Sequence, residues 1–93
     1  MPGRIETYVH SDSITPHKGA SMIRVLTQTD FAARTEAFQA FAHKAARRAY
    51  AAGGSDWAAV VAMFPEIEED RLALARSLKE DVRVDVIYVL NLA

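Results

Sequence analysis

The sequence predicts an α+β domain, in which helices pack on one face of a small three-stranded antiparallel sheet. Two segments near the amino terminus and one near the carboxyl terminus alternate apolar and polar residues with a period of two, as half-buried strands do. The stretch between them, residues 30–79, has apolar residues at helical spacing. The order is therefore strand, strand, helices, strand, and we expect it to form one domain over residues 1–93.

The first strand is predicted over residues 4–10, where apolar residues alternate with more polar ones. Residues 11–19 are rich in Ser, Asp, Thr, Pro and Gly, which favour turns. We expect a polar hairpin loop there. A second strand follows over residues 20–27, and a loop of this length allows the two strands to pair antiparallel.

The first helix is predicted to begin after Thr29, whose hydroxyl can cap the free N–H groups of a helix start. A second start signal follows at Thr35-Glu36. We therefore expect a short turn over residues 30–33 and then a main body that ends near Ala51, because Gly53-Gly54 follows.

Two more helices are predicted before the last strand. One runs from Trp57 to about Phe64, where Pro65 would end it, and its apolar residues cover nearly the whole helical wheel, so we expect it to be buried. The other extends from Glu66 to about Lys79. Acidic residues in its first turns and basic residues near its end suit the helix dipole, which favours a place on the surface.

The last strand is predicted over residues 82–92. Strict alternation would place Val82, Val84, Val86, Tyr88 and Leu90 on one face, and Arg83, Asp85, Ile87, Val89 and Asn91 on the other. The second face begins charged and becomes apolar at Ile87 and Val89. If helices cover only one side of the sheet, the other side faces solvent and apolar residues there are not expected. We expect a loop or another protein surface to cover that end, and a homodimer is one alternative.

Composition argues against several classes of function. The chain has 11 Lys and Arg against 12 Asp and Glu, a formal charge of -1, and no basic run that would follow a phosphate backbone, so nucleic acid is not the expected partner. It has no Cys for disulfides or thiolate metal sites. No segment approaches the roughly 20 apolar residues that span a bilayer, and Met1–His10 lacks the apolar core of a signal peptide. We expect a cytoplasmic protein without a membrane partner.

No set of residues suggests covalent catalysis. His10, His17 and His43 lack the spacing of a ligand set, so we interpret them as solvated or capping histidines and expect no metal and no cofactor. The acidic residues near Glu66 have a sufficient structural reason at a helix start. Because no nucleophile is paired with a base, we do not expect an enzyme.

The junction between the second strand and the first helix places a hydroxyl, an acid and an aromatic residue in a row. In one interpretation Thr29 is a cap, Asp30 a first-turn acid and Phe31 a core aromatic. In the other, Phe31 projects outward as an interface anchor with Asp30 beside it. The pattern alone leaves both open.

These residues resemble a known family. Residues 28–41, Gln-Thr-Asp-Phe-Ala-Ala-Arg-Thr-Glu-Ala-Phe-Gln-Ala-Phe, look like the Thr-Asp-Phe segment and following helix of bacterial elongation factor Ts. The likeness continues at residues 3–10, 23–26, 70–74 and from 82, so that it covers residues 3–92 and corresponds to the amino-terminal half of the family's core, or dimerisation, region. Departures from the family pattern include Leu26-Thr27 before the motif and Ser77–Asp81 after the last helix.

The resemblance implies a partner and a site. Elongation factor Ts binds elongation factor Tu and speeds release of its GDP, so the implied partner is a Tu-class GTPase. The residues implied to contact it are Thr29, Asp30, Phe31 and Arg34. Phe38 and Phe41 would hold the helix on the sheet. The alternatives are a structural or oligomerising module of the same fold without exchange activity, and a competitor that occupies the same surface of elongation factor Tu.

Overall fold

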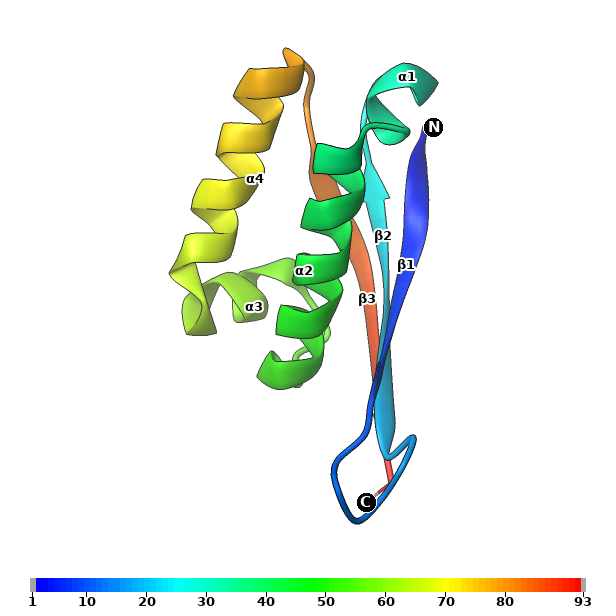
Figure 1. The fold of residues 1–93 in the computed structure, drawn as a ribbon. Helices are drawn as coiled ribbons and strands as arrows, with labels where there is room; N and C mark the ends of the chain where they lie inside the picture. The colour runs from blue at the N-terminus through cyan, green and yellow to red at the C-terminus, as the bar shows by residue number, and fades with distance from the viewer. Residues whose placement is uncertain (1, 93) are drawn as a thin grey trace.

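The structure is a computed structural model that describes residues 2–92, and in them it has three strands and four helices (Figure 1). The strands are β1 (Gly3–His10), β2 (Gly19–Leu26) and β3 (Arg83–Asn91). The helices are α1 (Asp30–Ala33), α2 (Glu36–Ala52), α3 (Trp57–Met63) and α4 (Pro65–Leu78). The predicted α+β class and the order strand, strand, helices, strand are confirmed.

The sheet has the order β1-β2-β3, with the central strand antiparallel to both neighbours. β1 and β2 form a hairpin whose pairing runs from Gly3 opposite Leu26 to His10 opposite Gly19. The hairpin end of the sheet extends beyond the helices (Figure 1). At the other end, β2 leads directly into α1.

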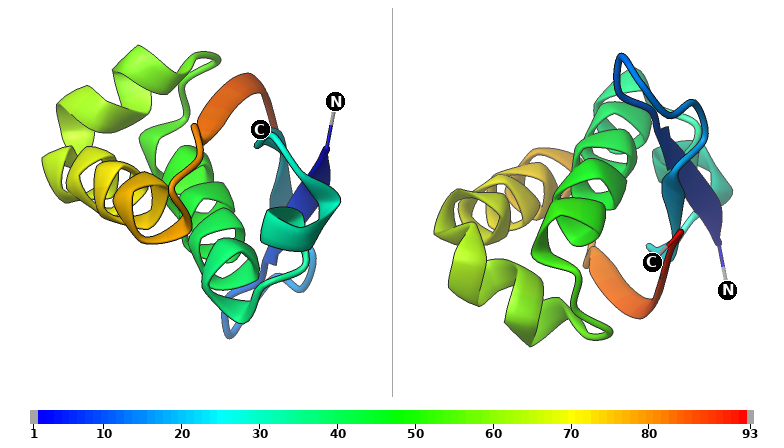
Figure 2. Two further views of the ribbon diagram at one scale, coloured as in Figure 1. Left: turned by 90° about the horizontal axis from the view of Figure 1, so that it is seen from above. Right: turned by 90° about the horizontal axis from the view of Figure 1, so that it is seen from below.

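The helices α2, α3 and α4 lie on one side of the sheet, as expected (Figure 2). α2 packs on β1 and β2, and α3 and α4 pack against α2 and against each other. The opposite face of the sheet has no helix over it within residues 2–92 (Figure 2). None of the helices in this part of the chain is long and apolar enough to cross a membrane.

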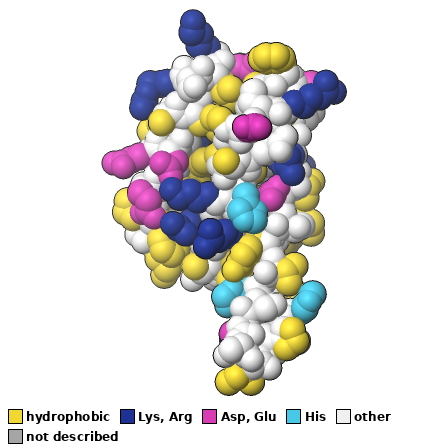
Figure 3. Space-filling view, in the orientation of Figure 1, with side chains coloured by type: hydrophobic (Ala, Val, Ile, Leu, Met, Phe, Trp, Pro, Cys, Tyr) yellow, Lys and Arg dark blue, Asp and Glu magenta, His cyan; other side chains and the backbone are white. Residues whose placement is uncertain are grey.

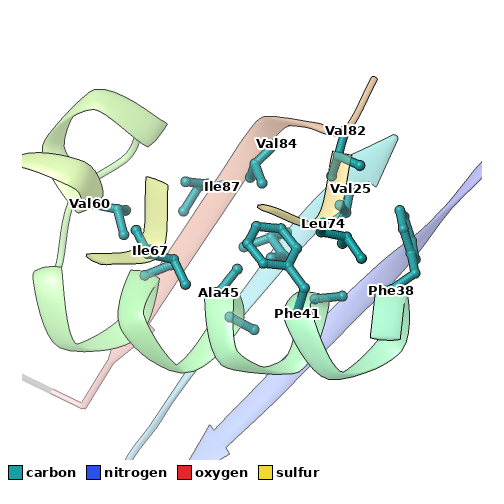
Figure 4. Close-up of a cluster of buried hydrophobic side chains, with 14 of the residues drawn as sticks. Val25, Phe38, Phe41, Ala45, Val60, Ile67, Leu74, Val82, Val84 and Ile87 are labelled. Atoms are coloured by element: carbon teal, nitrogen blue, oxygen red, sulfur yellow. The ribbon is translucent and has the colours of Figure 1, made fainter. Parts of the chain in front are cut away.

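The hydrophobic core lies between α2 and the sheet and continues to α3 and α4 (Figure 4). Phe38 and Phe41 of α2 are buried in it, at 0% and 6% exposed. The other large core residues are Ile23, Val25, Val60, Ile67, Leu74, Val82, Val84 and Ile87. Small alanines on the same side of α2, such as Ala45, let the helix approach the strands closely. The amino-terminal end of α2, which follows α1 closely in the chain, is thus held against the sheet.

The last strand contains a β-bulge at Asp85. Arg24 of β2 is opposite Val86, whereas the next residue, Val25, is opposite Val84, so Asp85 is an extra residue in β3. The Asp85 carboxylate accepts two hydrogen bonds from the Arg24 guanidinium, both at 2.9 Å. A bulge of this kind shifts the alternation of the strand by one residue.

The bulge overturns the predicted faces of β3. Ile87 is 4% exposed and Val89 is half-buried, and both pack against the core on the helix-covered side. The expectation that these two residues lie on the uncovered face is therefore wrong. Tyr88 and Leu90 occupy that face instead, and both are exposed.

The short helix α3 is less buried than its sequence predicts. Only Val60 of this helix is fully buried, while Met63 is exposed. Trp57 is half-buried, with its ring 6.3 Å from that of Phe41 and its Nε1 donating to Glu68 Oε1 at 3.2 Å. A continuous apolar wheel can therefore occur in a helix with one face at the surface.

α4 ends at Lys79, which adopts the left-handed conformation with φ 57° and ψ 35°. A residue with a Cβ pays roughly 1–2 kcal/mol for this conformation, and glycine avoids it, as Gly53 does at the end of α2 with φ 66°. We expect Lys79→Gly to raise the free energy of unfolding, measured by urea denaturation, by roughly 0.5–1 kcal/mol. The expected gain is smaller than the strain relieved, because glycine also has more freedom in the unfolded chain, which favours unfolding. Lys79→Ala, which keeps the Cβ, is the control. Equal stability of the two variants would contradict the prediction.

Candidate protein-binding site

The Phe31 turn, which we define as residues 29–34, contains α1 and the residues on either side of it. Thr29 is its N-cap, with extended backbone (φ -133°, ψ 150°), and its Oγ1 accepts a hydrogen bond from the backbone N–H of Ala32 at 3.1 Å. Asp30 is in the first turn, and Ala32 and Ala33 are buried. The predicted cap and first-turn acid are confirmed, and the two alanines attach the turn to the body of the protein.

Phe31 is 81% exposed, so the interpretation that it is a core aromatic is wrong. Asp30 and Arg34 are exposed as well, and the Arg34 carbonyl accepts a hydrogen bond from Gln39 Nε2 at 3.2 Å. α1 lies at the end of the molecule near the amino terminus, opposite the hairpin loop (Figure 1). The structure therefore brings Thr29, Asp30, Phe31 and Arg34 together in one exposed turn, and their contact with a partner stays a prediction.

The side chain of Glu80, just after α4, holds the residues that lead into this turn. Its Oε1 accepts hydrogen bonds from Thr27 Oγ1 and from the backbone N–H groups of Gln28 and Thr29, each at 3.0 Å. Its Oε2 accepts from Thr29 Oγ1 at 2.6 Å. Hydrogen bonds to an ionised carboxylate are stronger than neutral ones. Sequence reasoning missed Glu80, since it is 51 residues from Thr29 and no local spacing links the two.

A second connection joins the same segments. The Gln28 Oε1 accepts from the backbone N–H of Asp81 at 3.1 Å, and Thr27 Oγ1 is 2.9 Å from the Asp81 carbonyl. Thr27 is 1% exposed, so its hydroxyl lies in the interior. Residues 27–29 are thus held from outside by the segment between α4 and β3.

Hydrogen bonding lowers the pKa of Glu80 below its usual value of 4.5, chiefly through the Thr29 hydroxyl and against the effect of desolvation. A carboxyl group with a lowered pKa in the folded state stabilises the fold above its unfolded-state pKa, and this stabilisation is lost as the pH falls through the folded-state pKa. We therefore expect the urea midpoint of the wild type to fall below about pH 4.5, and that of Glu80→Gln to fall less steeply. The control Glu69→Gln, which makes the same change at an exposed position of α4, should follow the wild type. Parallel curves for Glu80→Gln and the wild type would contradict this prediction.

Several charged side chains over the helices are paired with one another. Figure 3 shows Lys and Arg side chains beside Asp and Glu on this face. Lys44 Nζ is 2.6 Å from Asp70 Oδ2, and Arg48 Nε is 3.5 Å from Glu66 Oε1. These surface ion pairs contribute little to stability, but they interrupt any basic patch.

The histidines have local neighbours. The Tyr8 hydroxyl is 2.9 Å from His10 Nδ1, and His43 Nδ1 is 3.3 Å from Glu6 Oε2. Within residues 2–92, no group of three or more His, Asp and Glu side chains is placed to hold a metal ion.

Comparison with known proteins shows similarity to elongation factor Ts. The chain is 39% identical over 69 residues to elongation factor Ts of Acinetobacter baumannii, which covers 70% of this chain and 24% of that protein. It is 40% identical over 73 residues to elongation factor Ts of Coxiella burnetii, which covers 72% of this chain and 25% of that protein. No protein-family model matches the chain. The chain spans about a quarter of the length of these relatives, and over that part it is related to elongation factor Ts.

Proposed function

We propose that this protein is a translation-related binding module that contacts an elongation factor Tu-class GTPase through the Phe31 turn and promotes release of GDP. The single observation that carries the proposal is the exposure of Phe31, at 81%, on an ordered turn. An exposed aromatic side chain on a fixed backbone is the kind of residue that dominates binding energy at interfaces. The similarity to elongation factor Ts supports the identity of the partner.

The proposed mechanism is coupled binding and involves no covalent chemistry. Suppose that the module binds the nucleotide-free GTPase more tightly than the GDP form. Then bound GDP lowers the affinity of the GTPase for the module, and the bound module lowers its affinity for GDP by the same factor. Phe31 would supply the apolar anchor. Asp30, whose carboxylate is exposed, would supply a negative charge close to the nucleotide and magnesium region of the partner. Such a role would place the protein in the cytoplasm, where translation takes place.

The test is the release rate of a fluorescent GDP analogue from elongation factor Tu, with and without this protein, together with direct binding. We expect faster release, and its loss in the double variant Asp30→Ala with Phe31→Ala. The matched control is Glu69→Ala with Leu72→Ala, which removes an exposed acid and an exposed apolar side chain from α4. Binding without faster release would identify a competitor, and absence of binding would refute the proposal.

A second candidate function, an oligomerising module, is favoured by the open face of the sheet. We define the open face by its outward-pointing residues: Ile5, Thr7, Val9, Met22, Val86, Tyr88 and Leu90. Most of them are apolar and exposed, Leu90 at 76%. An uncovered apolar sheet face of this kind commonly marks an interface.

The proposed occupant of the open face is a second copy of this chain. Arg24 and Asp85 on this side of β2 and β3 pair with each other through two hydrogen bonds, so neither presents an unpaired charge to a second copy, and Arg83, which is also exposed, lies at the end of β3. The face is long and narrow, which suits the aligned packing of another sheet. Strands of eight residues give a footprint of roughly 26 by 14 Å. This is about half of a standard interface of ~800 Å² per partner, so we expect a weak, concentration-dependent dimer.

Sedimentation velocity at increasing concentration tests this second candidate. We expect a dimer to appear in the high micromolar range and to be lost in Leu90→Lys, which adds a charge to the open face. Leu72→Lys, which adds the same charge to α4, should dimerise like the wild type. A strict monomer at every concentration, or equal behaviour of the two variants, would refute dimerisation through the open face.

A further inference from the structure

We propose that Glu80 is a positioning residue that orders the Phe31 turn for binding, an inference that rests on the proposed function of that turn. Glu80 follows α4 and is far from the turn in sequence, but its carboxylate meets the residues on which α1 begins. It acts through backbone and hydroxyl groups, and it leaves the side chains of Asp30 and Phe31 free.

The turn needs an external support because α1 has only four residues. A single helical turn fixes several backbone dihedral angles for very few hydrogen bonds, so it is unstable alone. Thr29 supplies one side-chain cap, to the N–H of Ala32. Glu80 adds four hydrogen bonds immediately before that cap, from Thr27, Gln28 and Thr29. The start of the turn is thus supported from outside, in addition to the backbone hydrogen bonds within the turn, such as that from Ala33 to the Thr29 carbonyl.

The contact between Glu80 and Thr29 also fixes the direction of the cap. The Thr29 hydroxyl has one proton, which it donates to Glu80 Oε2 at 2.6 Å. A lone pair of the same oxygen then points at the N–H of Ala32, which it accepts at 3.1 Å. Glu80 therefore selects the hydroxyl rotamer in which Thr29 can cap α1, and Phe31 lies in the chain between Thr29 and the capped residue Ala32.

The position of Glu80 is itself set by the end of α4. The left-handed Lys79 turns the chain, and the backbone N–H of Glu80 donates to the Ala75 carbonyl at 3.2 Å. The next residue, Asp81, donates its backbone N–H to Gln28 Oε1. The backbone at Glu80 is therefore held by α4 and the backbone at Asp81 by the Gln28 side chain, so the carboxylate can transmit the position of α4 to the turn.

Two substitutions of Glu80 distinguish the effect of its hydrogen bonds from the effect of its negative charge. Glu80→Ala removes all four hydrogen bonds to the carboxylate. Glu80→Gln keeps one carbonyl oxygen for the Thr27, Gln28 and Thr29 donors, but it replaces the other oxygen with an NH₂ group that cannot accept the Thr29 proton. Glu69→Ala removes an exposed acid from α4 and is the control.

The first readout is amide hydrogen exchange in the free protein. We expect the N–H groups of Gln28, Thr29 and Ala32 to exchange about tenfold faster in Glu80→Ala, less so in Glu80→Gln, and unchanged in Glu69→Ala, since a hydrogen bond to a charged group is worth about a tenfold change in an equilibrium or more. Far-ultraviolet circular dichroism checks that each variant is folded. If Glu80→Ala does not fold, Glu80→Gln carries the test alone. Unchanged exchange in the folded variants would overturn the inference.

The second readout is binding to elongation factor Tu. We expect Glu80→Ala to weaken binding about tenfold and to have no further effect in a Phe31→Ala background, because positioning acts through Phe31. An equal loss in both backgrounds, or unchanged binding alongside faster exchange, would overturn the positioning role. If the wild type does not bind at all, the proposed function fails, while the exchange measurement still decides whether Glu80 orders the turn.

Discussion

Phe31→Ala should weaken binding to elongation factor Tu by roughly 30-fold or more, the loss of about 2 kcal/mol that defines a binding hot spot. The free energy of unfolding should stay within about 0.5 kcal/mol of the wild type, because the ring is 81% exposed and packs little in the free protein. Isothermal titration calorimetry and urea denaturation measure the two quantities. Loss of binding without loss of stability is the signature of a residue that acts at an interface.

The control for Phe31→Ala is Met63→Ala, which removes an exposed apolar side chain from α3. Met63 is on a different helix from the proposed site, so its variant should bind as the wild type does. Comparable losses for the two variants would indicate a general effect of exposed apolar surface. They would contradict the assignment of Phe31 as the anchor.

Phe38→Ala should have the opposite signature. Phe38 is 0% exposed and lies between α2 and the sheet, so truncation removes buried apolar area and leaves a cavity (Figure 4). Such a substitution costs about 3–5 kcal/mol, a large part of the roughly 5–15 kcal/mol that stabilises a typical domain. We expect a much lower urea midpoint, or an unfolded protein at 37 °C.

The two phenylalanine substitutions are controls for each other, because they make the same chemical change seven positions apart. Stability should distinguish them by several kilocalories per mole. If Phe38→Ala were as stable as Phe31→Ala, the description of α2 as the element that holds the core would be wrong. Circular dichroism at several temperatures gives an independent check of the same comparison.

The strands and helices could be predicted because each has a clear local signal. The period changes from two to 3.6 after Thr27, and Thr29, Thr35 and Gly53 are at the helix ends where their side chains or backbone favour them. Pro65, predicted as a stop for one helix, is also the first residue of the next. Such signals depend on neighbours in the chain, so a sequence contains them directly.

The faces of β3 and the support of the Phe31 turn could not be predicted in the same way. The alternation of β3 is interrupted by Asp85, and only pairing with Arg24 and Val25 of β2 reveals the extra residue. Glu80 meets Thr29 because α4 and β2 end on the same side of the fold. Both features come from tertiary arrangement, which periodicity does not contain. The exposure of Phe31 could not be predicted either, because its position in a helix is compatible with a buried or an exposed side chain.

The bulge at Asp85 also determines which changes of chain length β3 can tolerate. Deletion of Asp85 would leave Val84 opposite Val25 and Val86 opposite Arg24, so the strand would alternate simply, with Ile87 still in the core and Tyr88 still outward. Deletion of a residue elsewhere in β3, such as Ile87, would instead turn every residue beyond it to the opposite face. Homologous strands of this type should therefore differ in length at the bulge more readily than at any other place in β3.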